Sequence, residues 1–253
     1  MAPAFLAPGV PNDYYAQIRA VEDDHWWFRG MREISAALLG RRLHTSARVL
    51  DAGCGTGGYL RWLLERGTFD SSAGVDVAAA AVELARERVP EAELHVAPLS
   101  ALPFPDETFD LAVTNDVVQH VDESEIGRSI DELRRVLRPG GTLLVRTNGS
   151  RRLRRERSDW RAYDGPTLRR QLEDGGLVVE RLTHANVLPS LWGRSRGRVP
   201  HAPSDEQHGI PGAEPALRST VGSALLRAEA LALALPAVRL PYGHTIFALA
   251  RRP

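Results

Sequence analysis

The feature of this 253-residue chain that most limits its fold is the segment Val49-Leu50-Asp51-Ala52-Gly53-Cys54-Gly55-Thr56-Gly57. Apolar residues lead into an acid, and three glycines then occupy alternate positions. This is the pattern of a buried parallel strand that passes through a tight turn into a helix. Glycine lets the backbone approach a ligand because no Cβ lies in the way, and the turn exposes free N–H groups. The segment therefore predicts a ligand-binding turn at the end of a strand.

A second acid closes the next apolar stretch. Asp76 ends Ala73-Gly74-Val75-Asp76, which predicts another strand. At that place a carboxylate can accept hydrogen bonds from both hydroxyls of a ribose. The glycine turn and Asp76 together predict a site for a nucleoside cofactor, and they leave open which nucleoside it is.

Composition excludes several classes of protein. The formal net charge is zero, so no overall field favours nucleic acid or an anionic membrane. The single cysteine, Cys54, excludes an internal disulfide and suits a reducing cytoplasm. The N-terminus lacks a secretion signal, and the longest apolar run, 228–238, is too short to span a bilayer. We therefore expect a cytoplasmic protein with no membrane span and no nucleic-acid partner.

Strand and helix patterns alternate from residue 47 onward. We expect strands at 47–51, 72–76, 93–96, 110–114, 142–147, 177–183 and 244–250. We expect helices at 57–66, 78–88, 124–137, 166–174 and 214–235, after an N-terminal helical pattern from Asp13 to Leu43. Repeated strand–helix units predict a parallel sheet covered on both faces. The site should then lie along the edge where the strands end.

The organisation of the chain follows from these patterns. We expect an N-terminal helical cap (1–43), a core (44–185), an insertion or lid with a helix (186–241) and a final core strand (242–253). Residues 190–213 are rich in Gly, Pro, His and Arg without apolar periodicity, and are interpreted as a lid or substrate loop. The arginine-rich segment 151–157 either meets an anionic group of a substrate or is a solvated loop, and its composition favours the solvated loop.

A glycine-rich turn alone does not separate dinucleotide folds from methyl-donor folds, because both use one. The acid inside the first motif is one feature that separates them. The others are Leu102-Pro103-Phe104-Pro105-Asp106-Glu107-Thr108-Phe109-Asp110, Asn115-Asp116-Val117-Val118-Gln119-His120-Val121, Glu132-Leu133-Arg134-Arg135-Val136-Leu137-Arg138-Pro139-Gly140-Gly141, and the final apolar strand with two arginines.

With these motifs the chain resembles the class I S-adenosylmethionine-dependent methyltransferases, in the large group that acts on small molecules. The resemblance covers about residues 47–183 together with 244–250. It implies an α/β, Rossmann-like sheet of seven strands, mostly parallel with an antiparallel last strand and with helices on both faces. The helical N-terminus and the insertion near the C-terminus would cover the site.

The resemblance also implies positions for the methyl donor. Its methionine part would lie over Asp51, Gly53, Cys54 and Gly55, with the ribose on Asp76. Val77 and Leu99 would contact the adenine, Leu99 through its backbone N–H and its side chain. One departure is clear, since the acid usual before Leu99 is Pro98 here, which leaves adenine recognition to backbone groups and apolar packing. Cys54 is interpreted as part of the turn, because no basic partner lies nearby in sequence to make it a nucleophile.

The segment from His25 to Arg32 also resembles a recurrent N-terminal element of this group. Trp26 and Trp27 cannot both face one side of a helix, so one should pack on the sheet while the other, which we take to be Trp27, faces the donor or the substrate. Arg32 would pair with the donor carboxylate, a task suited to guanidinium, or else belong to a packing helix with surface arginines.

Methyl transfer is an in-line displacement at a sulfonium methyl, and alignment of the reacting atoms supplies much of its rate. A base helps when the nucleophile is a hydroxyl. His120 has the best position for such a base, but histidine there often only packs or hydrogen-bonds. Asn115 and Gln119 would contact donor or substrate, and Tyr14, His25 and Tyr163 are further candidates on the substrate side. No cluster has metal-ligand spacing, so no metal is expected.

The function expected from the resemblance is transfer of a methyl group from S-adenosylmethionine to an O, N or C nucleophile of a small molecule, in bacterial specialised metabolism. One alternative is a donor-binding enzyme that performs cyclisation or rearrangement. Another is a non-catalytic partner protein. A nicotinamide dehydrogenase would leave the Pro-Gly-Gly and Leu-Pro-Phe elements without a role. A homodimer is left open.

Overall fold

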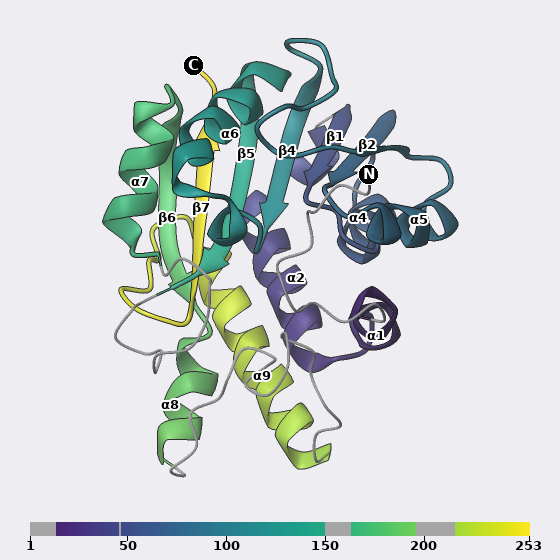
Figure 1. Ribbon diagram of the computed structural model, residues 1–253. Coiled ribbons are helices and arrows are strands. Elements are labelled where there is room, and N and C mark those ends of the chain that lie inside the picture. Colours follow the sequence, from purple (N-terminus) through teal and green to yellow (C-terminus); the bar gives the residue numbers. More distant parts are fainter. Residues whose placement is uncertain (1–13, 46, 150–162, 196–215) are drawn as a thin grey trace.

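The structure is a computed structural model that describes residues 14–45, 47–149, 163–195 and 216–253 (Figure 1). Its centre is a seven-stranded sheet in the order β3-β2-β1-β4-β5-β7-β6. β7 is antiparallel to both of its neighbours, β5 and β6, whereas the other described pairs are parallel. The seven-stranded, mostly parallel sheet with an antiparallel last strand is therefore confirmed.

The strands follow the predicted places closely. They are β1 (Arg48–Ala52), β2 (Ser71–Asp76), β3 (Glu93–Val96), β4 (Phe109–Asn115), β5 (Leu137–Asn148), β6 (Val178–Ala185) and β7 (Thr245–Arg251). β5 is longer than expected because Phe109 pairs with Leu137, so that the strand begins before the Pro139-Gly140-Gly141 segment. A shift of register between Phe109 and Leu111 absorbs the extra residues.

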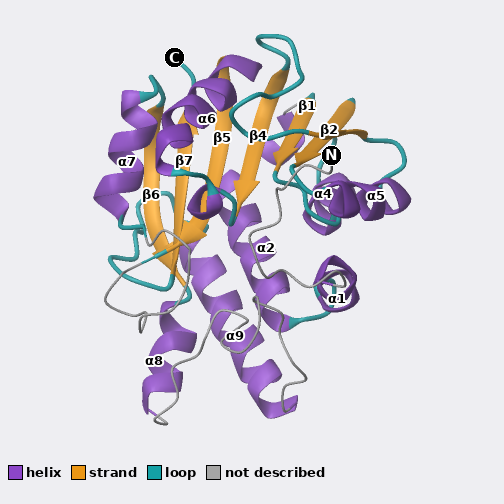
Figure 2. Ribbon diagram, in the orientation of Figure 1, coloured by secondary structure: helices purple, strands orange, loops and turns teal. Residues whose placement is uncertain are grey.

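Helices cover both faces of the sheet (Figure 2). They are α1 (Tyr14–Val21), α2 (Trp26–Leu39), α3 (Arg42–Thr45), α4 (Gly58–Arg66), α5 (Ala79–Arg88), α6 (Glu123–Val136), α7 (Gly165–Asp174), α8 (Val187–Ser195) and α9 (Ala216–Leu233). Residues of α6 and α7 form one hydrophobic cluster with the sheet, and residues of α2, α4, α5 and α9 form the other. The two-faced covering follows from strands that are buried along almost their whole length.

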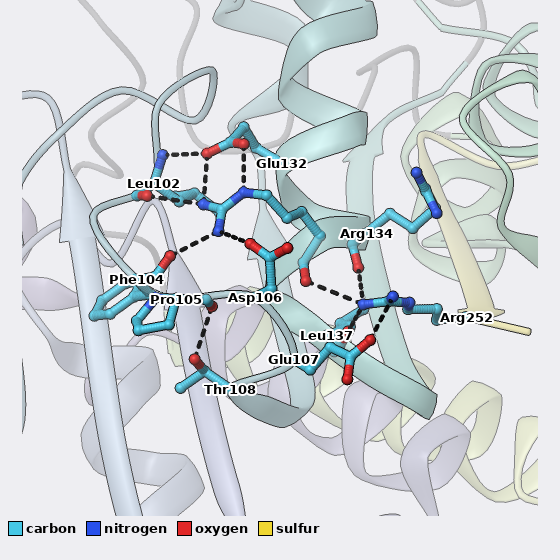
Figure 3. A network of polar contacts seen from close by, with 11 residues as sticks. Leu102, Phe104, Pro105, Asp106, Glu107, Thr108, Glu132, Arg134, Leu137 and Arg252 are labelled. Atoms are coloured by element: carbon cyan, nitrogen blue, oxygen red, sulfur yellow. Dashed lines mark hydrogen bonds and ion pairs between the residues drawn. The ribbon is translucent and has the colours of Figure 1, made fainter.

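At the amino-terminal ends of β4 and β5, two arginines tie together the motifs that separated the methyl-donor folds from the dinucleotide folds. Arg135 donates to Asp106 (2.8 Å), to the Phe104 carbonyl (2.8 Å) and to the Leu102 carbonyl (3.0 Å), as Figure 3 shows. Its Nε also donates to Glu132 at 2.7 Å. The Leu-Pro-Phe and Arg-Arg elements thus belong to one hydrogen-bond network, which joins α6 to the loop before β4.

Arg252, one of the two closing arginines, completes this edge (Figure 3). Its Nη1 donates to the carbonyls of Arg134, Arg135 and Leu137, which are the last carbonyls of α6 and the first of β5. Its Nη2 pairs with Glu107 at 2.9 Å. A cation at the carboxyl end of a helix satisfies carbonyls that have no partner within the helix.

In Figure 1 the arrows of β4 and β5 point toward α1, α2, α8 and α9, which gather at the carboxyl ends of the parallel strands. α2 and α9 approach closely because each offers a glycine to the other. A Cβ on Gly30 would lie 2.3 Å from Leu226, and a Cβ on Gly222 would lie 2.5 Å from the ring of Trp26. The N-terminal helix α2 and the late helix α9 thus form one packed pair.

Two expectations need comment. The segment 190–213 was expected to be irregular, but its first residues belong to α8. Glu229 fixes the start of this helix, because its carboxylate accepts hydrogen bonds from the N–H groups of Asn186 and Leu188 at 2.6 Å each. The rest of that segment up to residue 213 and the arginine-rich segment 151–157 lie outside the described residues. The division into cap, core, insertion and final strand stays a prediction.

Over the described ranges, the structure has no helix with both the length and the apolar character needed to cross a bilayer.

Candidate functional site

The glycine turn joins β1 to α4 and is held against β2. The N–H groups of Gly53 and Cys54 both donate to the Val75 carbonyl, at 2.7 and 2.8 Å. Gly53 has a φ of 93°, and a Cβ there would lie 2.1 Å from Val117. A side chain at Gly53 is therefore excluded twice, by backbone conformation and by space.

Asp76 links the glycine turn to the start of α5. One carboxylate oxygen accepts from the Gly55 N–H and the other from the Ala78 N–H, each at 2.9 Å. Burial raises the pKa of Asp76, and the N–H donors of Ala78 and Gly55 act against that rise. The carboxylate lies at the end of β2, as the sequence predicts, and Val77 beside it is half-buried.

Asp51 is the most confined acid of this edge. Its side chain is 1% exposed, and neither carboxylate oxygen has a hydrogen-bond partner among the described residues. Burial raises the pKa of Asp51 well above its usual value, Asp76 adds to the rise, and Arg146 opposes it. A buried carboxylate without partners is costly in a folded protein, so its partner is expected to come from a ligand.

The helix α2 carries the two tryptophans. Trp26 packs on Gly222 of α9, whereas Trp27 turns to the sheet, where the guanidinium of Arg146 lies 5.3 Å from its ring centre. Trp26 thus packs on α9, and the position of Trp27 at the donor stays a prediction. The indole Nε1 of Trp27 is buried and has no hydrogen-bond partner within the described residues.

The ends of β4 and β5 carry an ion pair, between a buried arginine and a half-buried aspartate, that the sequence analysis missed. Arg146 is 6% exposed, and its Nε and Nη2 donate to one oxygen of Asp116 at 3.0 and 2.6 Å. Asp116 has a φ of 58°, and its N–H donates to the Arg146 carbonyl at 2.8 Å. The available signal was a lone arginine inside the apolar strand segment Leu143-Leu144-Val145-Arg146.

A second missed group fastens the turn between α1 and α2 to the glycine turn. Glu22 is 8% exposed and accepts from the Thr56 hydroxyl and from Arg88. Asp23, next to it, also pairs with Arg88, and Arg32 lies 3.5 Å from Asp23. Arg32 thus faces the acids of the turn between the two helices.

The remaining candidates divide between exposed and core positions. His120 is exposed in the 3₁₀ turn η1 (Val118–His120). Gln119 is buried, and its amide oxygen accepts from the Thr147 hydroxyl (2.8 Å) and the Asn148 N–H (3.0 Å). Tyr163 is 1% exposed, and its hydroxyl donates to the Val118 carbonyl. Gln119 therefore hydrogen-bonds to the end of β5, and Tyr163 hydrogen-bonds to the 3₁₀ turn after β4.

On the α1 side, burial raises the pKa of Tyr14, and nearby Asp116 and Asp76 add to the rise. Tyr14, the first residue of α1, therefore lies within electrostatic range of both acids. His25 is the N-cap of α2 and accepts from the Trp27 N–H at 3.3 Å.

Leu99, which is predicted to contact the adenine, has its side chain almost fully buried. The Leu99 side chain is 5% exposed and belongs to the hydrophobic cluster under α6 and α7. Pro98 before it is exposed.

Asn115 is half-buried at the end of β4, where it pairs with Arg146 in register. Burial raises the pKa of the nearby Tyr59 to about 12, and the side chains of Ser35 and Asn115 act against the rise.

Cys54 and metal chemistry can be addressed directly. Cys54 is 5% exposed, and burial raises the pKa of its thiol far above the usual value, which favours the neutral thiol over a nucleophilic thiolate. In the part of the chain that the structure describes, no three His, Cys, Asp or Glu side chains gather in a way that could hold a metal ion.

Known sequences and structures match this geometry. Residues 50–145 match the family described as "Methyltransferase domain". This match supports the class I S-adenosylmethionine-dependent methyltransferase that the resemblance predicts. The match covers the glycine turn, Asp76 and the end of β4, but not α1, α2, α8 or α9.

Among curated relatives, the malonyl-[acyl-carrier protein] O-methyltransferase of Serratia marcescens is 33% identical over 135 residues, which are 53% of this chain and 51% of that protein. This chain spans about half the length of the curated relatives it matches. Among solved structures, the putative methyltransferase in complex with the Trm112 activator of Haloferax volcanii has a TM-score of 0.65 at 19% identity, and the match covers 96% of this chain and 95% of the other. The [4+2]-cyclase SpnF has a TM-score of 0.61 at 22% identity, covering 90% and 83%.

Proposed function

We propose that this protein transfers a methyl group from S-adenosylmethionine to a small-molecule acceptor. The observation that carries the proposal is the pair of acids at the ends of β1 and β2, one on each side of the glycine turn. Asp51 has two buried oxygens without partners, which suits the amino group of a methionine moiety. Asp76 lies on the adjacent strand, where a carboxylate suits ribose hydroxyls.

The residues present fit this cofactor, which supplies an electrophilic methyl on a sulfonium when it is bound. Asp51, with the backbone of Gly53, Cys54 and Gly55, would bind the methionine end, and the Trp27 indole N–H would donate to it. Asp76 would exchange its bonds to Gly55 and Ala78, wholly or in part, for the ribose. Val77 and the backbone at Leu99 would contact the adenine, with Arg32 and Asn115 at the methionine end.

For the acceptor atom we propose oxygen. The Serratia marcescens relative is named an O-methyltransferase that acts on a malonyl-carrier protein, and this supports an oxygen nucleophile here without fixing the substrate. Specialised metabolism, a cytoplasmic location and a homodimer stay predictions.

A second function, cyclisation or rearrangement without methyl transfer, is supported by one observation. The [4+2]-cyclase SpnF shares the fold over 90% of this chain. A non-catalytic partner role is less well supported, because Asp51, Asp76 and the glycines are all in place.

Isothermal titration of the full chain against S-adenosylmethionine, S-adenosylhomocysteine and NAD tests the cofactor. We expect both sulfur compounds to bind and NAD not to. Binding of NAD alone would refute the proposal. Incubation with labelled donor and a panel of hydroxyl and carboxylate acceptors then tests the reaction, and donor binding without any methylated product would favour the cyclase-like alternative.

Asp76→Ala should weaken donor binding by about 1–3 kcal/mol, because it removes a charge-assisted hydrogen-bond acceptor. The measurement is titration with S-adenosylhomocysteine. Asp106→Ala serves as the control, since its carboxylate lies at the opposite edge of the sheet and pairs with Arg135. An Asp76→Ala variant with the dissociation constant of the wild type would remove Asp76 from the site.

His120→Ala separates a base from a packing residue. If His120 takes a proton from a hydroxyl acceptor, the variant should lose about 100-fold or more in turnover while donor affinity stays unchanged. Turnover is measured with hydroxyl and carboxylate acceptors side by side, because a carboxylate is already ionised and needs no base. Equal turnover of variant and wild type on hydroxyl acceptors would make His120 a structural residue.

A further inference from the structure

The inference concerns the ion pair of Arg146 and Asp116. Arg146 lies near the end of β5, in register with Asn115 of β4 on one side and Phe247 of β7 on the other. It therefore projects from the middle of the sheet, at the edge where the candidate site lies and under Trp27 of α2. An arginine at 6% exposure in this position needs a physical reason.

Stability does not supply that reason. Moving a guanidinium out of water costs several kcal/mol, and a buried ion pair often contributes no more than apolar residues of the same volume would. The neighbouring strand positions Leu144 and Phe247 are apolar and fully buried, so an aliphatic residue would suit position 146. Asp116 also adopts a positive φ of 58°, a conformation that side chains rarely adopt and that often marks a functional site.

The geometry of the pair leaves part of the guanidinium unused. Nε and Nη2 both donate to the same oxygen of Asp116, and Nη1 forms no hydrogen bond with any described residue. The face of the guanidinium is held by the Trp27 ring, and the Asp116 backbone is tied to Arg146 through its N–H. The side chain is thus fixed from two sides, with N–H donors remaining on the Nη edge.

The sheet register places Arg146 near the proposed cofactor site. Asp51 of β1 pairs with Val113 of β4, and Val113 pairs with Leu144 of β5, so Arg146 lies two residues further along β5 on the same face as Leu144. The guanidinium lies on the β5 side, away from the ribose position at the end of β2. A planar guanidinium with a free edge matches a carboxylate or phosphate group in two-point geometry.

We propose that Arg146, oriented by Asp116 and Trp27, binds an anionic oxygen group of the acceptor, so that the substrate of this protein is a carboxylate or phosphate compound. This rests on the proposed methyl-transfer function and narrows its substrate class. For a carboxylate acceptor the reaction balances without a base: the carboxylate oxygen forms the bond to the methyl carbon, the carbon–sulfur bond breaks, and its electron pair stays on the sulfur.

The test uses the full chain saturated with S-adenosylhomocysteine and three probes, namely malonate, methyl phosphate and dimethyl malonate as the neutral control. Saturation-transfer NMR and isothermal titration give their affinities. We expect one or both anions to bind and the neutral ester not to, and the stronger anion identifies carboxylate or phosphate as the source. Arg146→Gln should weaken anion binding by about 10-fold to 100-fold and should change the affinity for S-adenosylhomocysteine by a smaller factor, because Asp51, Asp76 and the glycine turn stay in place.

Two further variants make the result specific. Arg138→Gln is the matched control, because Arg138 pairs with Asp110 at 2.6 Å at the opposite edge of the sheet, and it should bind anions as the wild type does. Arg146→Lys keeps the buried charge beside Asp116, so it should fold even if Arg146→Gln does not. It loses the planar fork and should bind anions about tenfold less tightly.

The proposal is overturned if the wild type binds no anion, or if Arg146→Gln and Arg146→Lys both bind anions as tightly as the wild type. It is also overturned if these variants lose affinity for S-adenosylhomocysteine while anion binding is unchanged, because Arg146 would then serve the cofactor. Failure of the proposed function is seen separately, as a wild type that does not bind S-adenosylhomocysteine. The anion titrations are repeated without that compound, so they test Arg146 in either case.

Discussion

The amino-terminal and carboxyl ends of the parallel strands, which form two opposite edges of the sheet, use the same residue types in opposite ways. At the amino-terminal ends of β4 and β5, Arg135 and Arg252 donate to carboxylates and to backbone carbonyls on several sides (Figure 3). At the carboxyl ends, Asp51 has no partner in the described structure, and Arg146 uses only one edge of its guanidinium.

This difference separates polar residues that stabilise the fold from polar residues that bind a ligand. A polar network whose donors and acceptors are paired fastens the fold, whereas buried polar groups left without partners destabilise it unless a ligand completes them. The motifs that mark the family in sequence are therefore of two kinds. The Leu-Pro-Phe and Arg-Arg elements hold α6 to the sheet, and the glycine turn with its acids faces the ligand.

The strongest test of this contrast is Asp51→Asn. We expect the affinity for S-adenosylmethionine to fall by about 1.5–3 kcal/mol, because a charged acceptor is lost. We also expect the ligand-free protein to become more stable at pH 7, since a buried carboxylate without partners is removed. Titration and urea unfolding measure the two effects. A variant that is less stable and binds normally would make Asp51 a structural residue and end the contrast.

At the opposite edge, Arg135→Ala should lower the free energy of unfolding by about 1–2 kcal/mol, because two carbonyls lose their Arg135 donor and Glu132 keeps the Leu102 N–H but loses the guanidinium. Its affinity for S-adenosylhomocysteine should not change. Arg138→Ala is the control, since this half-exposed arginine makes a single ion pair and should cost less than about 1 kcal/mol. A folded Arg135→Ala protein with weakened cofactor binding would show that the two edges are coupled.

The smallest expected effect is on the pH dependence of stability, where the two edges have opposite signs. Burial raises the pKa of Asp51, so the folded protein keeps this proton after the unfolded chain has released it, and stability falls as the pH rises above about 4. The hydrogen bond from Arg135 lowers the pKa of Glu132. Its contribution is therefore complete above about pH 4.3 and is lost as the pH falls through the folded pKa.

Urea unfolding between pH 3 and pH 8 measures how the free energy of unfolding changes with pH at both ends of this range. Asp51→Asn should flatten the decline on the alkaline side of this range, and Glu132→Gln should flatten the decline on the acid side. Identical slopes for Asp51→Asn and the wild type would mean that Asp51 titrates alike in the folded and unfolded chain.

The sequence predicted the sheet and the glycine turn well, because both depend on local pattern. Apolar runs ending in Asp51 and Asp76, with glycines between them, determine the strands and the turn almost residue by residue. The start of β5 at Leu137 and the helix α8 were missed, because long-range pairing with Phe109 and capping by Glu229 decide them.

The site was predicted less completely for a similar reason. The contact of Glu22 with Thr56 and that of Arg146 with Asp116 join residues 30 or more positions apart, and no local spacing encodes them. Trp27 was placed near the donor by resemblance, but its stacking on Arg146 depends on how α2 crosses the sheet.

The crossing of α2 and α9 has a consequence for how the molecule is made. Trp26 emerges early during synthesis, and the Gly222 surface that covers it emerges only after most of the sheet. Contacts between distant parts of a chain form late in folding, because a large loop must close first. The packing of α2 against α9 is therefore expected to be the last part of the fold to consolidate, and a nascent chain would acquire its glycine turn well before it acquires this helix pair.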